Sequence, residues 1–171
     1  MTGYHTLAET EKAMATHLKG LPIDMAAAEA VSNLYRAANI ARNHLTQTVL
    51  KDVDLTWTAF VVLWVTWMWD GIESRHAAEE AAISKATLTG VVQTLERRGL
   101  LARFGDSDDR RLVRLRLTNE GRSLMQKLYP VFNAEEQFIV STLSPRVRST
   151  MTRGLRAIVA HLESQSDTRR P

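Results

Sequence analysis

The spacing of hydrophobic residues along the chain predicts that most of it is helical. Between Ile23 and Val49, apolar residues recur at intervals of three or four, as they do along one face of a helix. This stripe has no breaker and is long for a small globular protein, so we expect the helix to pack against more than its own domain. The polar residues 1–22 form an arm before it, in which Thr6 to His17 is a candidate short helix.

A second predicted helix begins near Thr56, after a turn at residues 51–54, and ends at Asp70-Gly71. It contains all four tryptophans of the protein. Steps of three and four place four of its aromatic side chains on one stripe: Trp57, Phe60, Trp64 and Trp67. A helix that is apolar around most of its circumference is either buried or lines a cavity, and the pattern leaves both alternatives open.

A pair of shorter helices follows. Residues 73–82 predict a short helix that packs through its alanines. Ser84 is placed to cap the next helix, which continues to Arg98 and ends on Gly99, a residue type favoured just after the last helical turn. The inner face of this second helix consists of Leu88, Val91, Val92 and Leu95.

After Gly99 the hydrophobic pattern changes from helical spacing to alternation, which is typical of strands. Residues 100–104 and 112–117 are the two predicted strands, and residues 105–109 are the turn between them. A short helix, a turn, a second helix and a β-hairpin in this order form a winged helix-turn-helix. In this motif the second helix fits the major groove of DNA.

Two further helices complete the chain. Thr118 is placed to cap a long helix that continues to about Val140 and bends near Pro130. A serine and a proline, Ser144-Pro145, then begin a final amphipathic helix, and the residues from 164 onward form a polar tail. The pattern as a whole predicts a mainly α fold with a small β-hairpin wing.

The composition excludes several classes of protein. There is no cysteine, which rules out a disulfide framework, thiolate metal sites and thiol redox sensing. The five histidines lack metal-ligand spacing, no catalytic motif is present, and no segment resembles an export signal or a membrane span. We expect neither an enzyme nor a metal or cofactor site. We also expect a cytoplasmic location, at the nucleoid when the protein is bound to DNA.

Basic residues are concentrated in one segment. The net charge of the whole chain is only +3, but residues 84–122 carry nine basic and five acidic residues, a net charge of +4. The excess lies at the end of the second short helix and along the hairpin, beside hydroxyl and amide side chains. Such a surface is suited to contact phosphate, although the charge alone is equally consistent with an ordinary solvated surface.

The exposed face of the helix after Ser84 supplies most of the candidate DNA contacts. Ala86 and Gly90 let the helix approach DNA closely, and Gln93 is a candidate for reading adenine. An arginine at the tip of the hairpin is suited to the minor groove, where negative potential is concentrated; an ordinary acidic turn is the alternative. The full candidate set is Ser84, Lys85, Ala86, Thr87, Thr89, Gly90, Gln93, Arg97, Asp109, Arg110 and Arg111.

Four short motifs lie in this segment: SKATLT at the start of the helix after Ser84, LERRGL at the end of that helix, DDRR at the tip of the hairpin, and LTNEG at the next helix. In this order and spacing they resemble the MarR (multiple antibiotic resistance regulator) family of transcription factors. The resemblance extends over about residues 25–163, because the flanking helices match the family's layout, and leaves out the first 22 residues. One departure is Gly90, where a long basic residue is common in the family.

The resemblance implies an obligate homodimer that binds a pseudo-palindromic operator in double-stranded DNA, with half-sites about 34–36 Å apart. It also implies that residues 84–93 read the major groove, that Arg111 contacts the minor groove, and that Asp109 holds Arg111 or the base of the wing. The domains that follow are an arm at 1–22, dimerisation helices at 23–55 and 119–163, a winged helix-turn-helix DNA-binding domain at 56–118, and a tail at 164–171.

The resemblance further implies a repressor that is released by a small aromatic or phenolic ligand. Members of the family often bind such compounds between the dimerisation helices and the winged helix, and binding lowers the affinity for DNA. The aromatic stripe is the candidate pocket wall, and core packing is the alternative for each of its residues. Candidate ligand contacts are Tyr35, Arg36, Asn39, Trp57, Phe60, Trp64 and Trp67, with His44 as a further polar group.

Two other functions remain open at this point. A winged helix that docks a protein partner through its apolar helices would show weak salt dependence and no operator preference. A small-molecule-binding or enzymatic protein built around the tryptophans would need a catalytic residue, and the sequence offers none.

Overall fold

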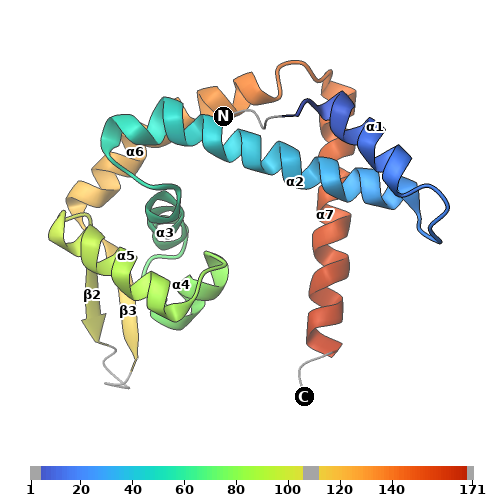
Figure 1. Ribbon diagram of the computed structural model, residues 1–171. Helices are drawn as coiled ribbons and strands as arrows, with labels where there is room; N and C mark the ends of the chain where they lie inside the picture. The colour runs from blue at the N-terminus through green and yellow to red at the C-terminus, as the bar shows by residue number, and fades with distance from the viewer. Residues whose placement is uncertain (1–4, 106–111, 169–171) are drawn as a thin grey trace. The chain divides into compact units, whose positions relative to one another are not determined.

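The computed structural model describes residues 5–105 and 112–168 (Figure 1), with side chains described as far as residue 165. The chain divides into two compact units, Met1–Phe132 and Asn133–Pro171. Asp109, Arg110 and Arg111, which the sequence places among the DNA contacts, lie outside the described residues. No helix within the described part of the chain combines the length and the apolar character needed to cross a membrane.

The arm contains the short helix that the sequence predicts, α1 (Leu7–His17). Its first turn is closed by a capping box, in which the Thr6 hydroxyl accepts from the Glu9 N–H at 3.2 Å and the Glu9 carboxylate accepts from the Thr6 N–H at 2.7 Å. The Arg36 guanidinium on the next helix donates to the Thr10 hydroxyl at 2.6 Å and holds α1 against it.

The long apolar stripe after the arm forms α2 (Met25–Leu45), which continues into a π-helical turn (Thr46–Leu50) and a 3₁₀ turn (Lys51–Val53). The turn predicted at residues 51–54 is therefore present, and it ends on Asp54 with a left-handed φ of 51°. Leu50, at the end of the π-helical turn, has a fully buried side chain. This segment anchors the end of α2 in the core.

Three helices form the helix-turn-helix part: α3 (Trp57–Met68), α4 (Ser74–Glu80) and α5 (Lys85–Arg97). Thr56 caps α3 and Ser84 caps α5, as their positions in the sequence predict. The turn between α4 and α5 contains Ala82 with a φ of 51°, a conformation that residues other than Gly, Asn and Asp rarely adopt. Leu88, Val92 and Leu95 are the buried residues of α5, so its opposite face is fixed toward solvent.

The sheet has three strands rather than the two of the predicted hairpin. Strands β2 (Leu101–Gly105) and β3 (Val113–Leu117) form the hairpin, and β1 (Ile72–Glu73) pairs with the other edge of β3. All pairs are antiparallel, with Ile72 opposite Leu115 and Leu101 opposite Leu117. The third strand ties the segment between α3 and α4 to the hairpin.

The core of the first unit lies between the helix-turn-helix and the inner face of the sheet. Gly121, in the first turn of α6 (Asn119–Ile139), lies against the backbone of Leu100, because a Cβ on Gly121 would stand only 1.9 Å from the Leu100 carbonyl oxygen. The Thr118 hydroxyl donates to the Gly99 carbonyl at 2.6 Å and accepts from the Gly121 N–H at 3.0 Å. The largest fully buried side chains include Leu50, Leu63, Leu95, Leu101, Leu115 and Met125.

The second unit contains the end of α6 and the final helix, α7 (Pro145–Thr168). Pro130 lies inside α6 without ending it. The Ser144 hydroxyl accepts from the Val147 N–H at 3.4 Å, which places the start of α7 where the sequence predicts it. The polar tail predicted from residue 164 begins as part of α7, which is helical as far as Thr168. Periodic apolar side chains on α7 are exposed, including Val147, Met151, Leu155, Ile158, Val159 and Leu162.

Candidate nucleic-acid interface

The solvent-facing side of α5, here called the reading face, is built from small and polar side chains. The Ser84 hydroxyl accepts from the Thr87 N–H at 3.0 Å, which satisfies an N–H that the helix leaves without a partner. The buried face anchors the helix against the core, so the position of the reading face is set by the rest of the fold. Eight predicted contacts are exposed on it: Ser84, Lys85, Ala86, Thr87, Thr89, Gly90, Gln93 and Arg97.

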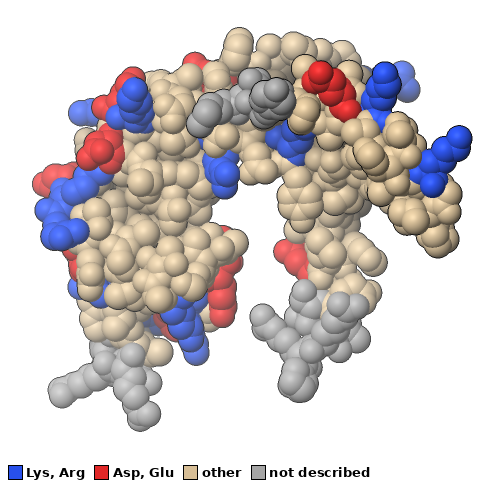
Figure 2. Space-filling model, in the orientation of Figure 1, with Lys and Arg blue, Asp and Glu red and all other residues tan. Residues whose placement is uncertain are grey.

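Most of the described arginines around α5 already have acceptors within the fold, which the charge count alone does not indicate. Five of the described arginines have acceptors: Arg98, Arg103, Arg114, Arg116 and Arg122. Lys85 and Arg97 form no ion pair with any described residue, although Arg97 donates to the Thr94 hydroxyl at 3.2 Å. Figure 2 shows basic and acidic side chains side by side over this part of the molecule. Lys85 and Arg97 are therefore the described cations of residues 84–122 that are most available to phosphate.

Arg98 connects the end of α5 to the turn that follows α2. Its guanidinium donates to the Val53 carbonyl at 2.9 Å and also to the Asp54 carbonyl. These two carbonyls lie at the end of the 3₁₀ turn, where helical carbonyls lack partners within the helix. Arg98 thus fixes the C-terminal end of α5, whereas its neighbour Arg97 faces solvent.

A second link joins α5 to the hairpin. The Arg103 guanidinium on β2 donates to the Glu96 carboxylate at 2.5 and 3.0 Å, and the backbone N–H of Arg103 donates to the same carboxylate at 3.2 Å. These hydrogen bonds, together with the positive charge of Arg103, hold the pKa of the Glu96 carboxyl below its usual value. The pair therefore fastens the hairpin to the reading helix.

Replacing Glu96 with glutamine is expected to remove a pH-dependent part of the stability. Because the pKa of Glu96 is lower in the folded state, its contribution is complete above the unfolded-state pKa of about 4.3 and is lost as the pH falls below it. The pair is about one-third exposed, so we expect Glu96→Gln to cost only about 0.5 kcal/mol at pH 7. Urea unfolding at pH 7 and pH 3 tests this. A difference between the two proteins that persists unchanged at pH 3 would contradict the assignment.

Asp70 joins the end of α3 to the hairpin and to α6. Its carboxylate lies 3.2 Å from Arg116 Nε on β3 and 3.8 Å from an Nη of Arg122 on α6. The Arg116 guanidinium also lies over the Phe104 ring, 4.7 Å from the ring centre. This junction could not be predicted from the sequence, in which Asp70 marks only the end of a helix.

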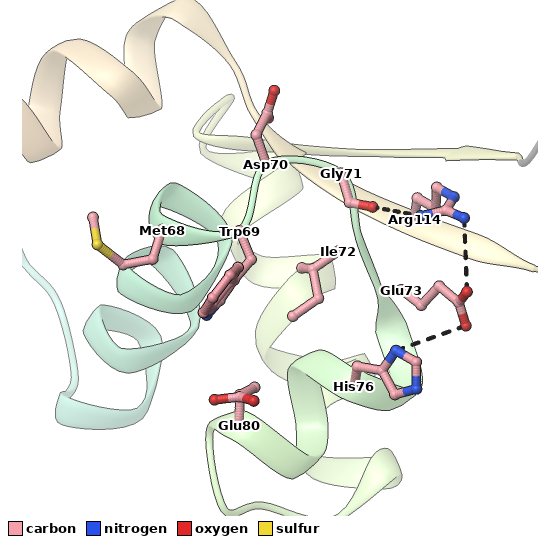
Figure 3. A pocket seen from close by; sticks show the side chains of 9 residues that line it. All are labelled: Met68, Trp69, Asp70, Gly71, Ile72, Glu73, His76, Glu80 and Arg114. Carbon is pink, nitrogen blue, oxygen red and sulfur yellow. Dashed lines mark hydrogen bonds and ion pairs between the residues drawn. The ribbon is translucent and has the colours of Figure 1, made fainter.

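A recess of about 520 Å³ lies beside this junction, formed by the end of α3, β1, α4 and β3 (Figure 3). Trp69 lies at its edge and is 61% exposed. Glu73 lies between His76 and Arg114, at 4.0 and 3.7 Å, and also pairs with Arg75 at 2.8 Å. The ion pairs of Glu73 with Arg75 and Arg114 connect β1 with α4 and β3.

The four aromatic residues of the predicted pocket wall do come together, and two residues of α6 join them. The Trp64 ring stacks on Tyr129 with centres 4.7 Å apart, and the Phe60 ring stacks on Phe132 at 4.4 Å. Phe60 is buried, whereas the three tryptophans are half-buried. We call these six residues the aromatic cluster: Trp57, Phe60, Trp64, Trp67, Tyr129 and Phe132.

The predicted polar ligand contacts on α2 form their hydrogen bonds with other parts of the fold or are exposed to solvent. Arg36 holds α1, as described above, and also donates to the His5 carbonyl at 3.4 Å. Tyr35 is 67% exposed and Asn39 is exposed as well. Among the described residues, the structure shows no hydrogen bond or ring contact from these three side chains to the aromatic cluster.

The fold and the exposed helix define a class of protein, the winged helix-turn-helix proteins. The MarR family model matches residues 55–113, which covers the helix-turn-helix and most of the hairpin. The chain is 32% identical to the HTH-type transcriptional regulator YwaE of Bacillus subtilis (strain 168) over 164 residues, 94% of this chain and 96% of that protein. The chain belongs to the MarR family.

Solved structures agree with this assignment. Bordetella bronchiseptica BpsR, whose DNA binding is regulated by 6-hydroxynicotinic acid, superposes with a TM-score of 0.70 and 30% identity, over 77% of this chain and 98% of BpsR. A mutant of Escherichia coli MarR in complex with operator DNA has the same fold, with a TM-score of 0.69 and 19% identity over 74% of this chain and 91% of that one. The curated relatives are transcriptional regulators, so the protein is a regulator and not an enzyme.

Proposed function

We propose that this regulator is a homodimeric repressor that reads a pseudo-palindromic operator. The observation that carries the proposal is the reading face of α5, which is exposed and polar and is anchored at its end by Glu96 and Arg98. In this proposal α5 enters the major groove, and the segment between β2 and β3, which contains Asp109, Arg110 and Arg111, contacts the adjacent minor groove. The two reading helices of the dimer meet half-sites about 34–36 Å apart.

The exposed apolar residues of the long helices support the homodimer. Clusters of large apolar side chains rarely remain open to solvent in a monomer, and a second copy of the chain is the simplest cover for them. We therefore propose residues 23–55 and 119–163 as the dimerisation helices. Exposed apolar residues on α2 and α6 are Val31, Tyr35, Ile40, Val131 and Phe138, in addition to those on α7.

Replacing Arg97 with alanine tests DNA binding by the reading face. If the Arg97 guanidinium neutralises one phosphate, the slope of log affinity against log salt should become shallower by about one unit, with a severalfold loss of affinity at low salt. Fluorescence anisotropy with a duplex selected from a randomised library measures both quantities. Lys127→Ala on α6 removes an exposed cation outside the helix-hairpin segment and serves as the control. Salt-independent binding without sequence preference would favour a protein-docking winged helix instead.

The effector that we propose is a small aromatic acid bound against the aromatic cluster. Two facts support it: the half-buried tryptophans of the cluster, and the regulation of BpsR by 6-hydroxynicotinic acid. A ligand releases DNA only if it binds the non-reading state of the dimer more tightly, and a hundredfold preference corresponds to about 2.7 kcal/mol. Derepression is then a shift between two states of the dimer.

Titration with 6-hydroxynicotinic acid is expected to change the tryptophan fluorescence and to lower the affinity for DNA over the same concentration range. Trp64→Phe should weaken both effects, because Trp64 belongs to the cluster. Trp69→Phe is the matched control, since Trp69 lies at the recess and outside the cluster. A fluorescence change that survives Trp64→Phe but disappears with Trp69→Phe would move the effector to the recess.

A further inference from the structure

Four residues form one line along the reading face of α5. Ala86, Gly90, Gln93 and Arg97 follow one another at intervals of four, three and four, so that successive members are neighbours on the helix surface. The line begins with the two smallest side chains of the helix, continues with an amide and ends with a guanidinium. Its chemistry therefore changes in steps from the start of α5 to its end.

The hydroxyl groups around this line already have partners within the helix. The Thr89 hydroxyl donates to the Lys85 carbonyl at 2.9 Å, and the Thr94 hydroxyl donates to the Gly90 carbonyl at 3.1 Å. The hydroxyls of Ser84 and Thr87 lie 2.8 Å apart and bond to each other. Gln93, by contrast, forms no hydrogen bond with any described residue, so its amide is the polar group of the line that is open to a base edge.

Gly90 has no structural reason to lack a side chain. Its φ is not in the left-handed region, and a Cβ built on it would meet nothing within 4 Å. Glycine is nevertheless less favourable than alanine inside a helix. Together with Ala86, one turn earlier, Gly90 leaves this part of the reading face without a long side chain, and we call the space over these two residues the notch.

We infer that this line reads A·T base pairs, with the C5-methyl group of a thymine in the notch between Ala86 and Gly90 and Gln93 on a neighbouring adenine. A glutamine amide can form two hydrogen bonds with adenine, one with N6 and one with N7, and small apolar groups suit the thymine methyl. Guanine, by contrast, is read most often by arginine or lysine. The cation of the line, Arg97, lies in the last turn of α5, where it suits phosphate. This inference rests on the proposed major-groove role of α5.

Replacing thymine by deoxyuridine tests the notch, because it removes only the methyl group. The probe is a duplex selected with the wild-type protein from a library with 20 randomised base pairs. We expect A·T pairs in both half-sites, and a three- to tenfold loss of affinity when the thymines at one or two positions of each half-site are replaced. Replacing the adjacent adenine by 7-deazaadenine should cause a similar loss in wild type and none in Gln93→Ala.

Gly90→Ala supplies the reciprocal test. The added methyl group should compete with the thymine methyl, so we expect at least a tenfold loss on the thymine duplex and a clearly smaller loss on the deoxyuridine duplex. The melting temperature should stay the same or rise, because alanine favours the helix, and this separates the loss from unfolding. Equal losses on both duplexes, or selected half-sites rich in G·C, would overturn the inference. Selective, salt-dependent binding in that case would leave the proposed function in place.

Discussion

Replacing Gly121 with alanine is expected to destabilise the first unit by about 3 kcal/mol, the upper end of the usual cost of overpacking. The new Cβ would stand 1.9 Å from the oxygen and 2.9 Å from the carbonyl carbon of Leu100. Both are backbone atoms and cannot rotate away as the end of a side chain would. The start of α6 would have to move, which would break the hydrogen bonds of Thr118 to Gly99 and Gly121.

Thermal and urea unfolding measure this effect. In a chain of this size, about 3 kcal/mol lowers the melting temperature by roughly 6–12 °C. Gly154→Ala is the matched control, because its Cβ would meet nothing within 4 Å and a helical alanine is favourable there. If both variants melted like the wild type, the close approach of α6 to Leu100 would be wrong.

Removing residues 145–171 is expected to convert the protein into a monomer and to lower its affinity for the operator by at least about a hundredfold. The deletion takes away α7 with its exposed apolar stripe, which we propose as part of the dimer interface. Binding of two linked half-sites gains a factor of about 10²–10⁴ over a single half-site, and a monomer loses that gain. Light scattering coupled to size exclusion gives the mass, and anisotropy gives the affinity.

Point substitutions in the full-length chain distinguish loss of the dimer interface from misfolding of the truncated chain. Leu155→Arg places a charge in the apolar stripe of α7, while Ser149→Arg places the same charge at a polar position of the helix. We expect Leu155→Arg to dissociate the dimer and Ser149→Arg to leave it intact. Dimers of full strength in both the truncated chain and Leu155→Arg would place the interface elsewhere.

The helices could be predicted because their signals are local. Ser84 before α5 and Gly99 after it lie next to the periodic pattern that they bound, and the structure confirms both, with Gly99 at a φ of 68°. Strand β1 could not be predicted, because two residues are too few to show alternation. The strand forms because Ile72 pairs with Leu115 on β3, which lies far along the chain.

The candidate site was predictable as a surface but not as a charge distribution. The exposed face of α5 follows directly from Leu88, Val92 and Leu95 on its other side. The sequence could not show which cations are already engaged, because the partners are distant: Arg116 is 46 residues from Asp70, and Arg98 is 45 residues from Val53. Long-range pairing of this kind depends on the tertiary fold and leaves no periodic trace.

The contact of Arg98 with the carbonyls of Val53 and Asp54 limits how the reading helix can move relative to the turn that follows α2. Arg98 fixes one end of α5 to the turn that follows α2, and Glu96 fixes the side of α5 to β2. Rotation of α5 about its own axis would therefore break charged hydrogen bonds. If the dimer shifts between two states as proposed, we expect α5 and the hairpin to move together. The affinity for DNA would then fall through the separation of the two reading helices, while the preferred bases stayed the same.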